Sequence, residues 1–107
     1  MINIEPKHLE IIREILNKYV SDATVWLFGS RTTVNIKPWS DIDLVIVGNN
    51  RTADCILNNL EESFSESDLP VRVDVLDWHR LTADFQSIIK QSHEIIHPST
   101  QRSELPN

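Results

Sequence analysis

The chain contains the run Thr24-Val25-Trp26-Leu27-Phe28-Gly29-Ser30-Arg31 and, ten residues after Arg31, the run Asp41-Ile42-Asp43-Leu44-Val45-Ile46-Val47. The first five residues are β-branched, aromatic or aliphatic, which favours a buried strand that ends at the glycine. Residues 43–47 are apolar on both faces after the aspartate, which is typical of a central strand in a sheet. These two strands, with a glycine-serine turn and a loop between them, are the predicted centre of the fold.

Helical and strand patterns alternate on either side of this centre. Apolar residues at spacings of three and four predict helices over residues 7–19 and 52–64. Thr82 is a candidate cap for a last helix that contains Phe85. Residues 71–75 alternate between apolar and polar side chains, which predicts a third strand.

The remaining C-terminal residues divide into a short strand and a tail. Residues 94–96 could add an edge strand to the sheet, whereas residues 98–107 carry two prolines and little apolar material. The sequence therefore predicts one α/β (α+β) domain over residues 1–97, with helices packed against a small mixed sheet. Residues 98–107 are predicted to be a disordered tail.

Size, charge and cysteine content limit the class of protein. A chain of 107 residues is long enough for one compact domain. Its formal net charge of −6 argues against a long nucleic acid as the main partner. The sequence has neither a run of about 20 apolar residues nor the pattern of a secretory signal, so a cytoplasmic location is expected. The single cysteine, Cys55, is expected to be a small buried hydrophobic residue on a helix.

Three aspartates are the candidate metal ligands. Because side chains alternate along a strand, Asp41 and Asp43 share one face. In the third strand, Asp74 points away from the valines on either side of it, and it would join the pair if the second and third strands are neighbours. Carboxylates this close repel one another unless a cation lies between them, and carboxylate oxygens suit Mg²⁺.

The glycine-serine turn is the candidate phosphate site. Gly29 allows a sharp turn and a close approach of phosphate, and Ser30 adds a hydroxyl beside free backbone N–H groups. Arg31 adds a fixed positive charge. Together with the aspartates, this turn predicts a site for a metal-bound nucleoside triphosphate.

Other residues have simpler interpretations beside functional ones. Arg72 could contact a substrate phosphate or form a salt bridge to a nearby carboxylate, and both interpretations stay open. Asp77 has the parity of the apolar face and precedes a turn, so we expect it to cap that turn. Trp26 is expected in the core, and Trp39 is the tryptophan best placed to contact a base or a partner.

The combined pattern resembles a known superfamily. The order Gly29-Ser30, a gap, Ser40-Asp41-Ile42-Asp43-Leu44 and a later strand aspartate is similar to the nucleotidyltransferases related to DNA polymerase β. In its small size, the chain resembles members of the MNT group, the minimal nucleotidyltransferases. This resemblance implies that Gly29, Ser30, Arg31 and Ser40 bind the nucleotide, with ATP as the donor. It also implies that Asp41, Asp43 and Asp74 bind two Mg²⁺ ions and carry catalysis.

The resemblance also implies a partner and a biological role. Members of the MNT group are commonly paired with a HEPN protein, a helical ribonuclease toxin. We therefore expect an antitoxin that transfers AMP to a hydroxyl of its HEPN partner. A homodimer is a further possibility.

One departure from the family pattern leaves a second interpretation open. The family commonly has Gly-Ser-Arg-Ala-Arg-Gly, whereas this chain has Thr33 in place of the second arginine and Val34 in place of the second glycine. A β-branched residue does not adopt a positive φ cheaply. The alternative is a catalytically weak or inactive binding module that neutralises its HEPN partner by contact.

Overall fold

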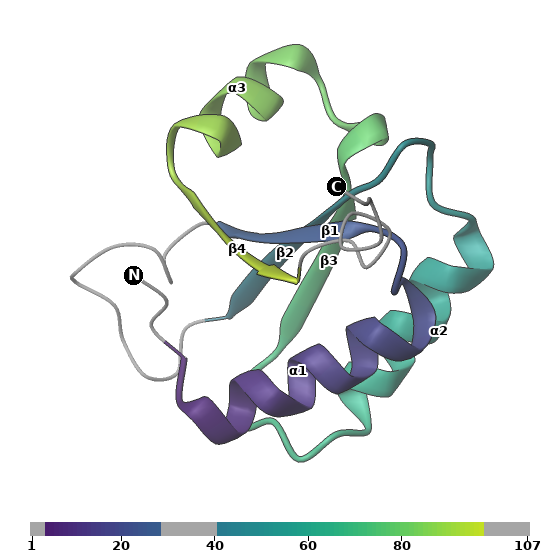
Figure 1. The fold of residues 1–107 in the computed structure, drawn as a ribbon, viewed down its shortest axis with the longest axis vertical. Coiled ribbons are helices and arrows are strands. Elements are labelled where there is room, and N and C mark those ends of the chain that lie inside the picture. Colours follow the sequence, from purple (N-terminus) through teal and green to yellow (C-terminus); the bar gives the residue numbers. More distant parts are fainter. Residues whose placement is uncertain (1–3, 29–40, 98–107) are drawn as a thin grey trace, which may run out of the picture.

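The computed structural model describes residues 4–28 and 41–97. Within them the chain forms three α-helices, four strands and a short 3₁₀ turn (Figure 1). In chain order the elements are α1 (Pro6–Tyr19), β1 (Thr24–Phe28), β2 (Ile42–Val47), α2 (Asp54–Ser65), β3 (Val73–Asp77), η2 (Trp78–Arg80), α3 (Ala83–Gln91) and β4 (His93–His97). The predicted α+β class is confirmed, and the helices and strands begin within a few residues of their expected positions.

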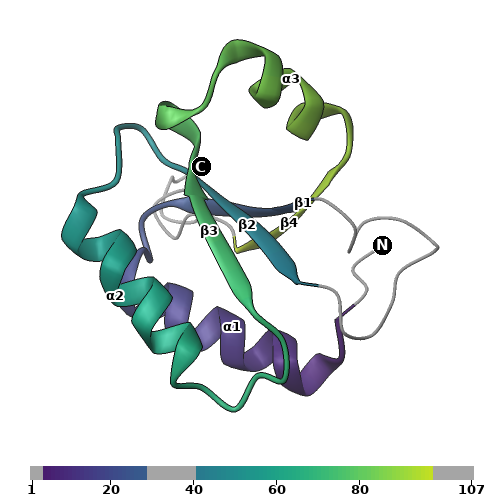
Figure 2. The same ribbon diagram turned by 180° about the vertical axis from the view of Figure 1, so that it is seen from behind.

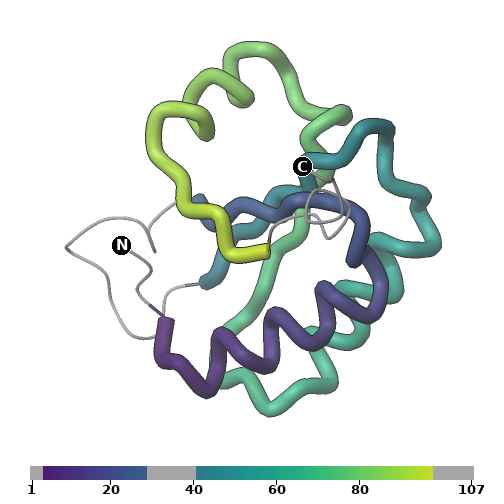
Figure 3. Tube along the Cα trace, in the orientation of Figure 1, coloured from purple at the N-terminus to yellow at the C-terminus, as the bar shows by residue number. Residues whose placement is uncertain are grey.

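The four strands form one mixed sheet in the order β3-β2-β1-β4. β1 pairs antiparallel with both β2 and β4, while β2 and β3 run parallel and are connected through α2. The second and third strands are therefore neighbours, which meets the condition under which Asp74 was expected to join the other two aspartates. The tube in Figure 3 shows the last strand, β4, lying alongside β1 from the first third of the chain.

The third strand runs from Val73 to Asp77 instead of the expected residues 71–75. The expectation was wrong at both ends because Leu76 and Asp77 continue the parallel ladder opposite Val45 and Ile46. An alternating pattern fixes which side chains share a face, but it does not fix where pairing with a neighbouring strand stops.

Helices cover both faces of the sheet. Figures 1 and 2 show α1 and α2 together on one side and α3 on the other. On the first side, Ile12 and Leu16 of α1 and Leu60 of α2 are completely buried against Leu27 and Leu44 of the sheet. The spacing of four between the two α1 residues places them on one helix face, as the sequence predicted.

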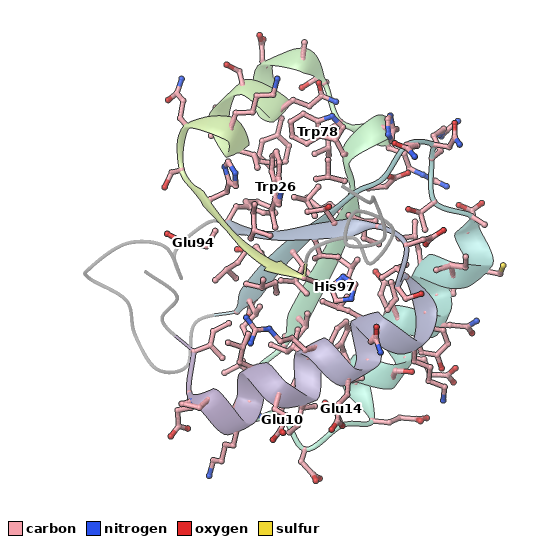
Figure 4. All side chains as sticks on the ribbon, in the orientation of Figure 1. Glu10, Glu14, Trp26, Trp78, Glu94 and His97 are labelled. Atoms are coloured by element: carbon pink, nitrogen blue, oxygen red, sulfur yellow. The ribbon has the colours of Figure 1, made fainter. Side chains whose placement is uncertain are left out.

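Large aromatic side chains fill the other side, beneath α3. The Trp26 ring stacks on His93 with centroids 3.9 Å apart and meets Trp78 edge-on at 5.3 Å. Figure 4 shows the two tryptophans between the sheet and α3. Ile89 of α3 is buried against the same group. Trp26 is partly buried and packs against this cluster, which agrees with its expected place at the core. Trp39 lies outside the described residues.

Two local predictions had opposite outcomes. The Thr82 hydroxyl accepts a hydrogen bond from the Phe85 N–H at 3.2 Å, so the predicted cap of α3 is confirmed. Cys55 lies on α2 as expected, but it is exposed, so its predicted burial is wrong. The helix turns Leu60 and Phe64 toward the core, which leaves Cys55 on the solvent side. In the part of the chain that the structure describes, no helix has the length and apolar character needed to cross a membrane.

Candidate functional site

The parallel ladder brings two of the predicted aspartates side by side. Asp43 of β2 and Asp74 of β3 are direct register partners, and paired strands lie about 4.8 Å apart. Both are partly buried, and strand alternation places them on the same sheet face as Val45 and Leu76, which pack in the cluster with Ile89 of α3. On its other side Asp43 is paired with Phe28, the last residue of β1. The two carboxylates therefore lie beside the strand end from which the predicted phosphate turn departs.

Asp41 lies just before β2 and is exposed. The ladder begins at the next residue, where the Ile42 N–H donates a hydrogen bond to the Arg72 carbonyl oxygen at 2.9 Å. Asp41 thus sits at the rim of the sheet, two residues before Asp43.

The charges of the three aspartates interact. Burial raises the pKa of Asp43, and the negative charges of Asp74 and then Asp41 raise it further. Repulsion of this kind requires the carboxylates to be near one another in a partly desolvated place. The three predicted acids are therefore close enough for the charges of Asp74 and Asp41 to act on Asp43.

Arg72 contacts one of these acids. Its Nε lies 3.0 Å from Oδ1 of Asp74, and its side chain is 75% exposed. The sequence left open whether Arg72 contacts a substrate phosphate or forms a salt bridge. The structure shows the salt bridge, to Asp74.

The donor set fits a divalent metal of the magnesium type, because it consists of carboxylate oxygens next to open surface. Within residues 4–28 and 41–97, however, no three His, Cys, Asp or Glu side chains are already gathered tightly enough to hold an ion. Like charges and the contact with Arg72 oppose such a gathering. The backbone thus places the ligands near one another, and the side chains would still have to converge on a cation.

Several predicted site residues fall outside the described part of the chain. They are the nucleotide-binding candidates Gly29, Ser30, Arg31 and Ser40, together with Thr33 and Val34. Their roles remain predictions.

Two of the pockets formed by the described residues lie near the edge strands of the sheet. The first, of about 430 Å³, is lined by Phe64 of α2, by Leu69 and Val71, and by Arg72 and Asp74 among others, so it opens directly beside the acidic site. The second, of about 880 Å³, lies between α1 and β4 and is lined by residues that include Glu10, Glu14 and His97, which Figure 4 labels. None of the three aspartates lines the second pocket, so its greater size does not connect it with the acidic site.

A second polar cluster lies at the opposite end of β3. The Asp77 side chain is fully buried and accepts hydrogen bonds from the Thr52 N–H at 2.9 Å, from Arg80 Nε at 3.2 Å and from the His79 N–H at 3.4 Å. The last of these is the predicted cap of the turn, which is confirmed.

Arg80 extends this cluster to α2. Its Nη2 lies 2.7 Å from Oδ1 of Asp54 and donates to the Thr52 carbonyl oxygen at 2.8 Å. The hydrogen bond that Arg80 donates to Asp54 is the main cause that raises the pKa of Arg80, so this guanidinium stays charged. The cluster joins the end of β3 to the start of α2. Sequence analysis missed these contacts because nothing in the sequence brings residues 52–54 next to residues 77–80.

A comparison with protein families now identifies the fold. The family model described as "Polymerase beta, Nucleotidyltransferase" matches residues 10–102. The chain belongs to this family. The resemblance inferred from the two motifs is confirmed, and it gives the paired acids of this nucleotidyltransferase a chemical context.

Individual relatives agree with the family assignment. A protein of Haemophilus influenzae named "Probable protein adenylyltransferase MntA" is 40% identical over 105 residues, which cover 98% of this chain and 92% of that protein. Among solved structures, a crystal structure of a toxin-antitoxin with AMP-PNP aligns with a TM-score of 0.71 at 19% identity, over 91% of this chain and 78% of the other.

A second solved structure has the same fold. This structure is described as a tri-AMPylated HEPN toxin of Shewanella oneidensis in complex with MNT antitoxin. The matched chain of the complex aligns with a TM-score of 0.68 at 17% identity. The match covers 95% of this chain and 79% of the other. At these identities the structural matches establish the nucleotidyltransferase fold.

Proposed function

We propose that this protein is a Mg²⁺-dependent nucleotidyltransferase that moves AMP from ATP to a hydroxyl of a HEPN toxin partner, and that it acts thereby as an antitoxin. The observation that carries the proposal is the register of Asp43 with Asp74, in a chain of the polymerase β nucleotidyltransferase family. The substrate and the partner come from the relatives, one named as a protein adenylyltransferase and another solved with an AMPylated HEPN toxin.

The three aspartates have distinct roles in this proposal. Asp41 and Asp43 would ligate the metal ions, and Asp74 would complete the second metal position and accept the proton of the attacking hydroxyl. When bound, two Mg²⁺ ions would neutralise the triphosphate and polarise the attacking and leaving oxygens. The acceptor oxygen forms a bond to the α-phosphorus, and the bond from that phosphorus to the bridging oxygen breaks, so pyrophosphate leaves.

The phosphates would be held by the turn that follows β1. Gly29 and Ser30 are proposed to bind the β- and γ-phosphates, with Arg31 and Ser40 as further contacts. β1 and β2 lead directly to this turn and to the acids, because Phe28 is the register partner of Asp43. The sheet thus supports a common position for the polyphosphate and the carboxylates.

The acceptor could reach Asp74 from the side of the neighbouring pocket. The pocket of about 430 Å³ combines apolar walls from Phe64 and Leu69 with Asp74 at its polar side. A projecting side chain of a partner protein would fit such a space, and its hydroxyl would come close to the proposed base. A cytoplasmic location is part of the same proposal.

A transfer assay tests the function directly. The purified protein, a HEPN partner, labelled ATP and Mg²⁺ are combined, and label on the partner is measured. We expect Asp41→Asn and Asp43→Asn to reduce transfer by about 100-fold or more, because metal positioning and charge neutralisation supply most of the rate. Asp54→Asn, an exposed aspartate on α2, is the matched control and should transfer at the wild-type rate.

The alternative function predicts a different result. Val34 stands where the family commonly has glycine, and this substitution favours a protein that neutralises its partner by contact alone. A tight complex with no transfer of label from any nucleotide would support that alternative and reject the enzyme.

A further inference from the structure

Arg72 lies beside the acid that is proposed to complete the metal site. Its carbonyl oxygen accepts the first hydrogen bond of the β2–β3 ladder, from Ile42, so its backbone is fixed two residues before Asp74. Its Nε reaches Oδ1 of Asp74 at 3.0 Å. The ion pair is therefore anchored by the start of a strand.

The pair is open to solvent. The Arg72 side chain is 75% exposed and the Asp74 side chain is 37% exposed. Exposed ion pairs of this kind are weak and open readily. A guanidinium also stays charged at every accessible pH, so Arg72 presents a permanent positive charge to this carboxylate.

A divalent cation and the guanidinium would compete for Asp74. The Oδ1 atom that Arg72 contacts is an oxygen that a metal would need, and the positive charge of Arg72 would repel an incoming cation. The negative charge of Asp74 already raises the pKa of its neighbour Asp43. Before a cation binds, the charge of Arg72 therefore reduces the repulsion between Asp74 and Asp43. After a cation binds, the same charge repels the cation.

We infer that Arg72 is a displaceable counter-ion of Asp74. This positioning residue balances the charge of Asp74 next to Asp43 while no cation is bound, and it turns toward solvent when a divalent cation takes the carboxylate. Arg72 thereby weakens cation binding and sets the metal concentration at which the site fills. The inference rests on the proposed metal site and adds a residue that tunes it.

Direct binding of Mn²⁺, without nucleotide or partner, tests the inference. Mn²⁺ affinity is measured by electron paramagnetic resonance at low salt for wild type, Arg72→Gln, Arg72→Lys and Arg51→Gln. We expect Arg72→Gln to bind Mn²⁺ about three- to tenfold more tightly, and Arg72→Lys to stay near wild type because it keeps the charge.

Arg51→Gln controls for the change in net charge. Arg51 is exposed in the connection after β2, at the other end of that strand from Asp43. Arg51→Gln removes the same charge as Arg72→Gln but at a position far from Asp74. We therefore expect Arg51→Gln to change the Mn²⁺ affinity by less than twofold. In EDTA, Arg72→Gln should have a slightly lower Tm than wild type. Adding excess Mn²⁺ should then raise the Tm of Arg72→Gln by more than it raises the Tm of wild type.

Two outcomes would overturn the inference, and they are distinguishable. If Asp43→Asn abolishes Mn²⁺ binding but Arg72→Gln binds no more tightly than Arg51→Gln, the role of Arg72 is rejected and the metal site stands. If Asp43→Asn binds Mn²⁺ as wild type does, the metal site is rejected, and both the proposed function and the inference fail with it.

Discussion

At the scale of one residue, Asp43 shows the cost of placing a partly buried carboxylate near two others. Burial, followed by the charges of Asp74 and Asp41, raises its pKa, so the folded chain binds a proton at this group more readily than the unfolded chain does. Its contribution to stability is fully present below the unfolded pKa and is lost as pH rises through the folded pKa. At neutral pH and without metal, the ionised group therefore destabilises the fold.

We expect Asp43→Asn to stabilise the metal-free protein at pH 7. The gain should be about 0.5 kcal/mol, because the group is partly exposed and solvent screens its charge, which corresponds to about 2–4 °C in Tm. Thermal unfolding in EDTA checks this, and the gain should shrink toward pH 4. Asp68→Asn, an exposed aspartate in the connection before β3, is the control and should leave Tm unchanged. A lower Tm for Asp43→Asn at pH 7 would contradict the assignment.

At the scale of elements, the Asp77 cluster holds β3 against the start of α2. Its side chain is fully buried and accepts three hydrogen bonds, two of them from the connection that follows β3 and one from Thr52. The same strand carries Asp74, and the cluster lies at the opposite end of that strand from Asp74. Asp74 and Asp77 lie on opposite faces of the sheet: Asp77 is buried in a structural cluster, and Asp74 lies at the proposed metal site.

Removing this acceptor should destabilise the whole domain. Asp77→Ala leaves the Thr52 N–H and the Arg80 guanidinium without their buried partner, and we expect a loss of about 2–4 kcal/mol, or a drop in Tm of about 10–20 °C. Chemical denaturation gives the free energy of unfolding. Asp54→Ala removes the exposed partner of the same arginine, at 79% exposure, and should cost no more than about 0.5 kcal/mol. Equal losses in the two variants would show that burial of Asp77 does not matter.

At the scale of the whole molecule, the periodicity of apolar residues predicted where the helices lie, and strand alternation predicted which side chains share a face of the sheet. The helices followed from apolar spacing, and the shared face of Asp43 and Asp74 followed from strand alternation once β2 and β3 were neighbours. The exposure of Cys55 depended on which side of α2 packs against the core. The extent of β3 and the contact of Asp77 with Thr52 depended on tertiary pairing. No local pattern encodes such pairing, which is why these features appear only in the folded chain.

Ligand binding at the proposed site would also raise the stability of the whole domain. A ligand that binds only the folded chain stabilises it by RT ln(1 + [L]/Kd), which is about 1.4 kcal/mol at ten times Kd. We therefore expect Mg²⁺ with a nonhydrolysable ATP analogue to raise Tm by about 5–10 °C under those conditions.

The acids must carry this gain if the proposed geometry is right. The ladder places Asp43 between Asp74 and Phe28, the last residue before the predicted phosphate-binding segment. The carboxylate of Asp43 would therefore hold the cation that the triphosphate brings. Asp43→Asn should therefore lose most of the ligand-induced rise in Tm, although its metal-free Tm is higher. Asp68→Asn should keep the rise, and the analogue in EDTA should give little of it in any variant. An undiminished rise in Asp43→Asn would place the nucleotide elsewhere on the molecule, because a ligand can stabilise the fold only through the residues that it contacts there.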